Sequence, residues 1–160
     1  MGIRAVLAGL VLIAASTTAS PIRTVPCAEI IDTVRFPYGG YRTVLGSVSV
    51  PRPYLAQVVA TRERPWAYWR KAGLLVRAGT PAVTVSVASA WRYRAAITWG
   101  NDTGVVASLR IAGCPGPRSV GNAYAGGFYL RARSGCVPLT FRVGRRSATV
   151  RFGVGRRCVR

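Results

Sequence analysis

Apolar residues recur at every second position in several stretches of this chain. In Trp91–Trp99, the odd-numbered residues are aromatic or aliphatic, and they alternate with polar or small residues that include Arg92 and Arg94. Val83–Val87 and Val105–Ile111 show the same alternation. A period of two places successive side chains on opposite faces of a strand, whereas an amphipathic helix needs a period near 3.6. The pattern therefore predicts half-buried β-strands.

The clearest hairpin is predicted between Val137 and Val154. With a four-residue turn at 144–147, Val143 pairs with Ala148, and Val137 pairs with Val154 at the open end. Every apolar pair then lies on one face and the Thr and Arg residues lie on the other. A slip of one residue would reverse the two faces, so the pattern favours this register.

Short alternating segments separated by Gly and Pro favour an all-β fold. We expect residues 20–160 to form one domain, an antiparallel β-sandwich of about seven to nine strands. A small β-barrel is the alternative, since the alternation does not show whether the sheet edges close. The segment Tyr124–Tyr129 (YAGGFY) is interpreted as an aromatic and glycine-rich loop.

The N-terminus has the organisation of a secretory signal peptide. Met1–Arg4 carries one cation, Ala5–Ala15 is uninterrupted apolar sequence, and Ser16–Ser20 is small and polar. Eleven apolar residues are few for a bilayer core of about 30 Å, which disfavours a permanent transmembrane helix. An uncleaved anchor and a buried helix are the alternatives. We expect residues 1–19 to be the signal, cleaved after Ala19, and the protein to be extracellular or envelope-associated.

Export makes the four cysteines, Cys27, Cys114, Cys136 and Cys158, candidates for two disulfides. A four-cysteine zinc site is the alternative, but no two cysteines have the short spacing that such sites use. Three connectivities are possible. In the predicted hairpin, Cys136 and Cys158 share the open end, which favours Cys136–Cys158 together with Cys27–Cys114.

The charge balance limits the available chemistry. The chain has 23 cationic side chains, four acids and no histidine. Histidine is the usual general base near neutral pH, and the few acids are too scattered to form a catalytic pair. We find no nucleophile elbow and no phosphate-binding or dinucleotide motif. The sequence therefore predicts a non-catalytic protein without catalytic residues, a metal site or a cofactor.

Arginines occur at the polar positions of the predicted strands. If these strands share a sheet, their guanidinium groups form a basic face that suits phosphate or carboxylate partners. The alternative is an ordinary solvated face. The polyanion-binding candidates are Arg92, Arg94, Arg131, Arg133, Arg142 and Arg151.

Aromatic and cationic residues are interleaved in the segment 62–71 (RERPWAYWRK). The rings of Trp66, Tyr68 and Trp69 are candidates for stacking on a ligand while the cations hold its charges. The alternative is structural, with Trp66 and Tyr68 in the core and Trp69 covering an edge.

The signal peptide, the Arg/Ala/Val/Gly bias and the closing run Gly126–Cys158 resemble small secreted proteins of actinobacteria. Trp99-Gly100 and Arg110–Cys114 extend the likeness, which covers mainly the C-terminal 60 residues. The resemblance implies export and a compact β fold. It implies no activity and no site residues.

Two functions fit these observations. The first is a secreted, non-catalytic cationic protein whose arginine face binds an anionic polymer, namely a cell-wall glycan, an acidic lipid surface or a nucleic acid. The second is an extracellular protein-recognition module, such as an enzyme inhibitor or an envelope assembly subunit. The first predicts binding that weakens steeply with salt, and the second predicts binding to one protein that tolerates salt.

Overall fold

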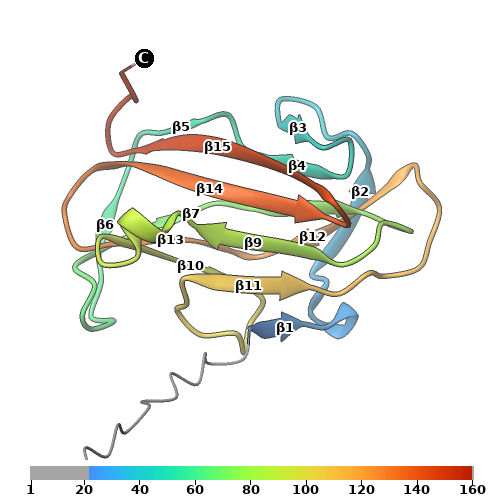
Figure 1. The fold of residues 1–160 in the computed structure, drawn as a ribbon, viewed down its shortest axis with the longest axis horizontal. Helices are drawn as coiled ribbons and strands as arrows, with labels where there is room; N and C mark the ends of the chain where they lie inside the picture. The colour runs from blue at the N-terminus through green and yellow to red at the C-terminus, as the bar shows by residue number, and fades with distance from the viewer. Residues whose placement is uncertain (1–21, 160) are drawn as a thin grey trace, which may run out of the picture.

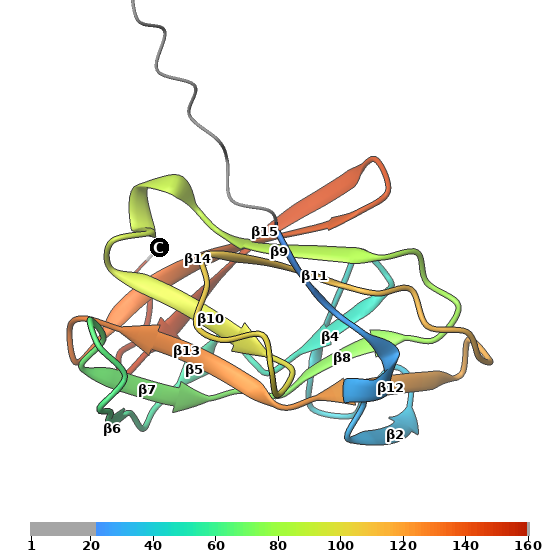
Figure 2. The ribbon, with the colours of Figure 1, turned by 90° about the horizontal axis from the view of Figure 1, so that it is seen from below.

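The computed structural model describes residues 22–159, which contain fifteen strands and two short 3-10 helices. The strands form sheets in two facing layers (Figure 2), so the predicted all-β, sandwich-like class is confirmed. The expected signal peptide, residues 1–19, lies outside the described residues. Within residues 22–159, neither helix has the length and apolar character needed to cross a membrane.

The front layer in Figure 1 is one six-stranded sheet. Its strands, in spatial order, are β1 (Arg23–Val25), β11 (Ser108–Ile111), β9 (Val83–Val87), β14 (Gly135–Val143), β15 (Arg146–Val154) and β5 (Tyr54–Leu55). The four central strands pair antiparallel, while β1 and β5 add parallel edges. This sheet therefore combines a local hairpin with partners that are distant in sequence.

The rear layer consists of two sheets. One contains, in order, β10 (Ala95–Trp99), β13 (Gly126–Leu130), β7 (Tyr68–Lys71) and β6 (Val59–Ala60). The other contains β2 (Asp32–Arg35), β12 (Val120–Tyr124), β8 (Leu74–Arg77), β4 (Val48–Val50) and β3 (Arg42–Val44). Only Ala125 separates β12 from β13, and only Ala72-Gly73 separates β7 from β8. These interruptions divide two long strands into four, and five further strands have only two or three residues, so the strand number exceeds the seven to nine expected.

The hydrophobic core lies between the two layers. Phe128 on β13 packs against Phe152 on β15 with ring centroids 5.2 Å apart, and against Trp99 on β10 at 5.9 Å. The Trp99 indole N–H donates a 2.8 Å hydrogen bond to the Ala72 carbonyl. A buried indole needs such a partner, since an unpaired donor is costly in an apolar interior. This aromatic chain joins the front sheet to the rear sheets.

The predicted alternation is confirmed within β9 and β11, whereas in β10 the even-numbered Ala96 is buried as well. The odd-numbered residues of all three strands are buried. The alternation fails before two strands. The predicted strand Val105–Ile111 begins only at Ser108, and Val106, expected to face outward, packs against the core.

The predicted strand Trp91–Trp99 also begins late, at Ala95, because a 3-10 helix, η2 (Ser89–Trp91), and a turn precede it. Tyr93, expected in the core, is 81% exposed. Arg92 and Arg94 are therefore not on a strand.

The C-terminal hairpin has the predicted faces but a different register. Val143 pairs with Arg146, and Val137 pairs with Phe152, so β15 is shifted by two residues from the expected pairing. The turn has two residues, with Gly144 at a positive φ of 58°. Two-residue hairpin turns favour positive φ, which glycine adopts without steric cost. A shift of two residues preserves which side chains face the core, so the alternation alone does not distinguish the two registers.

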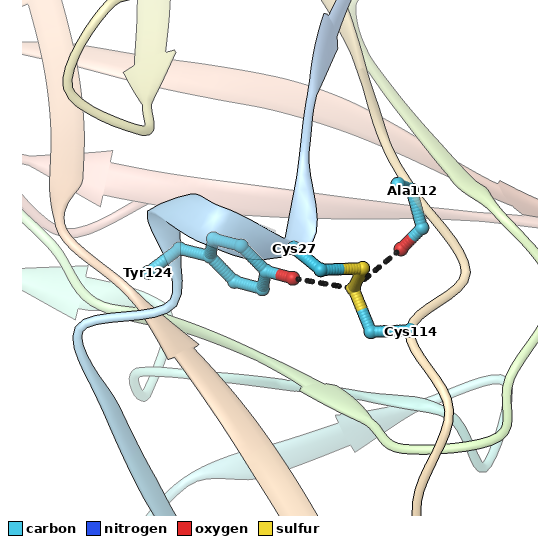
Figure 3. The surroundings of a disulfide bond; sticks show 4 residues. All are labelled: Cys27, Ala112, Cys114 and Tyr124. Atoms are coloured by element: carbon cyan, nitrogen blue, oxygen red, sulfur yellow. Dashed lines mark hydrogen bonds between the residues drawn. A yellow bond between two sulfur atoms is a disulfide. The ribbon is translucent and has the colours of Figure 1, made fainter.

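Both favoured disulfides are present. Cys27 is bonded to Cys114, and Cys136 is bonded to Cys158. All four sulfur atoms are therefore unavailable to the zinc site considered as the alternative. The first bridge ties the short 3-10 helix η1 (Cys27–Glu29) to the segment after β11, with the Tyr124 hydroxyl 3.5 Å from Cys114 Sγ (Figure 3). Two disulfides are consistent with an oxidising compartment.

The buried Tyr124 hydroxyl should make the free energy of unfolding depend on pH in the alkaline range. Burial, and secondly the Glu29 carboxylate, raise the pKa of its hydroxyl from 10.0 to about 12. The unfolded chain therefore ionises this tyrosine above pH 10, while the folded chain keeps it protonated. The free energy of unfolding should fall by about 1.4 kcal/mol per pH unit between pH 10 and 12 through this group alone.

We expect Tyr124→Phe to remove that slope and to change stability little near pH 7. Urea unfolding from pH 8 to 11.5 measures the difference. Tyr93→Phe, which alters a ring that is 81% exposed, supplies the reference slope. Equal alkaline slopes for the two variants would contradict this assignment.

Candidate functional site

A groove of about 810 Å³ lies on the outer face of the six-stranded sheet. Its floor carries hydroxyl side chains from three neighbouring strands, Ser108 on β11, Ser86 on β9 and Thr140 on β14. Arg23, Arg92 and Arg142 also line it. We call this hollow the hydroxyl groove. The sheet face that carries it is turned toward the viewer in Figure 1.

Strand register brings the hydroxyls into one row. Ser108 pairs with Ser86, Ser86 pairs with Thr140, and Thr140 pairs with Thr149 on β15. The neighbours of each residue along its strand face the core, so period-two alternation turns all four hydroxyls outward. Ser86 Oγ and Ser108 Oγ lie 2.7 Å apart, and the Oγ1 atoms of Thr140 and Thr149 lie 2.9 Å apart. The row crosses four strands as a line of hydrogen-bonding groups.

Three different parts of the chain supply the arginines of the groove. Arg142 projects from β14 beside Thr140, Arg92 follows η2, and Arg23 begins the edge strand β1. All three side chains are exposed. One Arg23 guanidinium nitrogen donates a long 3.5 Å hydrogen bond to the Asp102 carbonyl. The position of Arg23 depends on the parallel pairing of β1 with β11.

All of the charged side chains that line the groove are cationic. Of the four acids, all of which lie among residues 22–159, none lines it. Guanidinium groups only donate hydrogen bonds, and they match the oxygens of phosphate or carboxylate. Hydroxyls both donate and accept, so they suit the ester and alcohol oxygens between such charges. The arrangement is suited to bind anions, and it places no proton-transferring pair at the groove.

The predicted arginine candidates divide into two groups. Arg142 and Arg151 project from the same outer face of the β14–β15 hairpin, and Arg92 lines the groove beside it. The sequence predicts Arg131 and Arg133 on a strand, but they lie on the β13–β14 connection, and Arg94 lies in the turn before β10. The structure therefore brings three of the six candidates to one sheet face.

The other three candidates have different surroundings. The Arg94 guanidinium lies 5.6 Å from the Trp91 ring centroid, and that of Arg131 lies 5.8 Å from the Trp66 ring centroid. Arg133 borders a separate hollow with Gln57. None of these three side chains lines the hydroxyl groove.

The stacking candidates are mostly covered. Trp66 is only 9% exposed, and Tyr68 on β7 packs against the core. Trp69 is half-buried beside Tyr129, with ring centroids 6.4 Å apart. Pairing with β13 explains this placement, since Tyr68 opposes the buried Leu130 and Trp69 opposes the outward Tyr129. None of these three rings lines the hydroxyl groove.

Sequence reasoning missed Arg23 and the hydroxyl row. Arg23 belongs to a three-residue strand, too short to show alternation, and its partner strand begins at residue 108. The hydroxyl row left a signal, because Ser or Thr occupies outward positions of β9, β11, β14 and β15. These hydroxyls align only because of the register between neighbouring strands, and the sequence of one strand does not reveal that register.

Comparison with known protein families, curated proteins and solved structures finds no match to this chain. The chemistry of the hydroxyl groove is therefore the basis for assigning a function.

Proposed function

We propose that this chain is a secreted or envelope-associated, non-catalytic cationic protein that binds an anionic polymer on the outer face of its six-stranded sheet. The observation that carries the proposal is the hydroxyl groove, where Arg23, Arg92 and Arg142 converge over a floor of hydroxyls without an acid. The formal net charge of +19 adds long-range attraction for any polyanion. Two disulfides fit an oxidising location outside the cytoplasm.

The lining favours a glycan-like or polyol-like polymer over the other two polyanion classes. Proteins that bind single-stranded nucleic acid without sequence preference stack its bases on aromatic rings, and no aromatic side chain lines this groove. Peripheral membrane binding uses buried apolar area, and among residues 22–159 only Ile22 contributes a large exposed apolar side chain to the lining. Hydroxyls with guanidinium groups match a chain that carries both charges and alcohol oxygens.

The first test uses long-chain polyphosphate and poly(glycerol phosphate) as probes, with titrations at several salt concentrations. Three arginine–phosphate contacts predict a slope of about −2 for the logarithm of the binding constant against the logarithm of salt. Single-stranded DNA and vesicles containing phosphatidylglycerol are the comparison ligands. We expect both to bind more weakly than poly(glycerol phosphate) at about 150 mM salt.

The triple variant Arg23→Glu/Arg92→Glu/Arg142→Glu should lose at least about 100-fold in affinity, because it replaces three charge-assisted donors by repelling carboxylates. The matched control is Arg35→Glu/Arg62→Glu/Arg118→Glu, which changes the net charge equally at exposed sites that do not line the groove. Circular dichroism checks that both variants keep the fold.

Equal losses in the two variants would show that net charge, not the groove, drives binding. Absence of any polyanion binding at about 150 mM salt would refute the proposal. The alternative of a protein-recognition module would then be the better function.

A further inference from the structure

A second arginine cluster lies on the same outer face as the hydroxyl groove. Arg52, Tyr54, Arg151 and Arg157 line a hollow of about 610 Å³ at the β15–β5 edge of the six-stranded sheet. The Arg157 guanidinium lies over the Tyr54 ring, 4.6 Å from its centroid. We call this hollow the C-terminal hollow. Like the groove, it has no acidic side chain in its lining.

Strand pairing places the C-terminal hollow on the outer face. Tyr54 pairs with Gly153, and Leu55 pairs with Val154. Leu55 and Val154 are buried, so Tyr54 and Gly153 face outward, as does Arg151 two residues before Gly153. The hollow and the groove therefore open on the same side of one sheet.

The Cys136–Cys158 disulfide holds the C-terminal segment over this face. Cys136 faces outward on β14 and pairs with Gly153, and its bond to Cys158 draws residues 156–158 back across the sheet. A side chain at Gly153 would collide with the Arg156 carbonyl, so the segment lies directly on the strand. Arg157, next to the disulfide, is thereby fixed over Tyr54. Figure 1 shows the C-terminal segment turning upward from the end of β15.

The hydroxyl row connects the two hollows. Thr140 in the groove pairs with Thr149, and Arg151 follows on the same face of β15 two residues later. Arg142 pairs with Ser147, so Arg151 lies four residues along β15 from that pair and one strand across. At about 3.3 Å per residue and about 4.8 Å per strand, the two arginine Cα atoms are roughly 14 Å apart.

We propose that the groove and the C-terminal hollow are two subsites for one anionic polymer chain that follows the hydroxyl row between them. The inference rests on the proposed function and adds the class of ligand, a flexible chain of repeated phosphodiesters separated by polyol or sugar units. Phosphates occupy the arginines at both ends, and the intervening alcohol and ester oxygens bond to Thr140 and Thr149. The one aromatic ring in the C-terminal hollow, Tyr54, has Arg157 over its face and does not offer an open platform for a base.

Two subsites on one rigid sheet make affinity depend on chain length. A short oligomer reaches one subsite only, while a longer one binds the second subsite intramolecularly at an effective concentration near the millimolar range. We expect the affinity to rise by about 100-fold or more once the oligomer spans both subsites. A single-site binder would show only the gradual statistical increase that comes from more equivalent repeats.

The test measures the affinity of poly(glycerol phosphate) oligomers of graded length by calorimetry. The variant Arg52→Ala/Arg151→Ala/Arg157→Ala should keep the affinity of the groove for short oligomers, yet lose the 100-fold step for long ones. The control Arg35→Ala/Arg62→Ala/Arg118→Ala lowers the net charge equally and should keep the step. Opening the disulfide with Cys136→Ser/Cys158→Ser should also weaken the step, because Arg157 is released.

The outcomes separate this inference from the proposed function. If short oligomers bind the groove but no step appears, or the second-subsite variant keeps it, the inference is wrong and the proposed function stands. If oligomers of every length fail to bind, both are wrong. If single-stranded DNA of matched charge shows the same step with equal or higher affinity, the assigned ligand chemistry is wrong.

Discussion

Removal of the Cys27–Cys114 disulfide is expected to lower the free energy of unfolding by about 4–5 kcal/mol, and removal of Cys136–Cys158 by about 3 kcal/mol. The bridged residues are 87 positions apart in the first case and 22 in the second. A bridge that closes a longer loop removes more entropy from the unfolded chain. Urea unfolding of the variants Cys27→Ala/Cys114→Ala and Cys136→Ala/Cys158→Ala compares the two bridges directly.

Native contacts reinforce the larger effect of the first bridge. It is the covalent tie of β1, which pairs with β11 through three residues only and places Val25, with no exposed surface, in the core. Cys136 and Cys158 instead close the end of a hairpin whose strands are also joined by nine residue pairs. A smaller loss for Cys27→Ala/Cys114→Ala than for the other variant would show that loop length does not govern the stabilisation.

Local alternation predicts which face of a strand is buried, and it does so well in this chain. The inward positions of β9, β11, β14 and β15 agree with the expected ones. The register of the hairpin differs by two residues because either pairing buries the same side chains, and the two-residue turn at Gly144 decides between them. Alternation also predicts a strand over residues 91–94, before β10, but the backbone there forms the end of a 3-10 helix and a turn.

The candidate site could be predicted only in part, for a related reason. Arg142 and Arg151 follow from alternation within one hairpin, which is local information. Arg23 reaches the groove through a parallel pairing between distant segments, and Arg157 reaches the C-terminal hollow through a disulfide. Long-range pairings of this kind leave no periodic signal in the sequence, so the convergence of these cations becomes visible only in the folded chain.

The glycines of Tyr124–Tyr129 show how packing overrides a local interpretation. The sequence predicts a loop here, yet Gly126 and Gly127 begin β13, the strand that lies between β10 and β7. A Cβ atom at Gly127 would collide with the Arg70 carbonyl oxygen on β7, and one at Gly126 would collide with the Thr98 carbonyl oxygen on β10. The two glycines therefore permit close approach of three backbones rather than a turn.

Gly127→Ala should accordingly lower the free energy of unfolding by about 3 kcal/mol or more, because the clash is with backbone that cannot rotate away. Relief requires β7 to move, which would break its pairing with β13 beside the buried Phe128. Gly39→Ala is the control, since its added methyl group meets nothing within 4 Å. Its stability should change by no more than about 1 kcal/mol. Equal stabilities of the two variants in urea unfolding would mean that β7 yields easily, and that the rear layer is not held by the close approach of its strands.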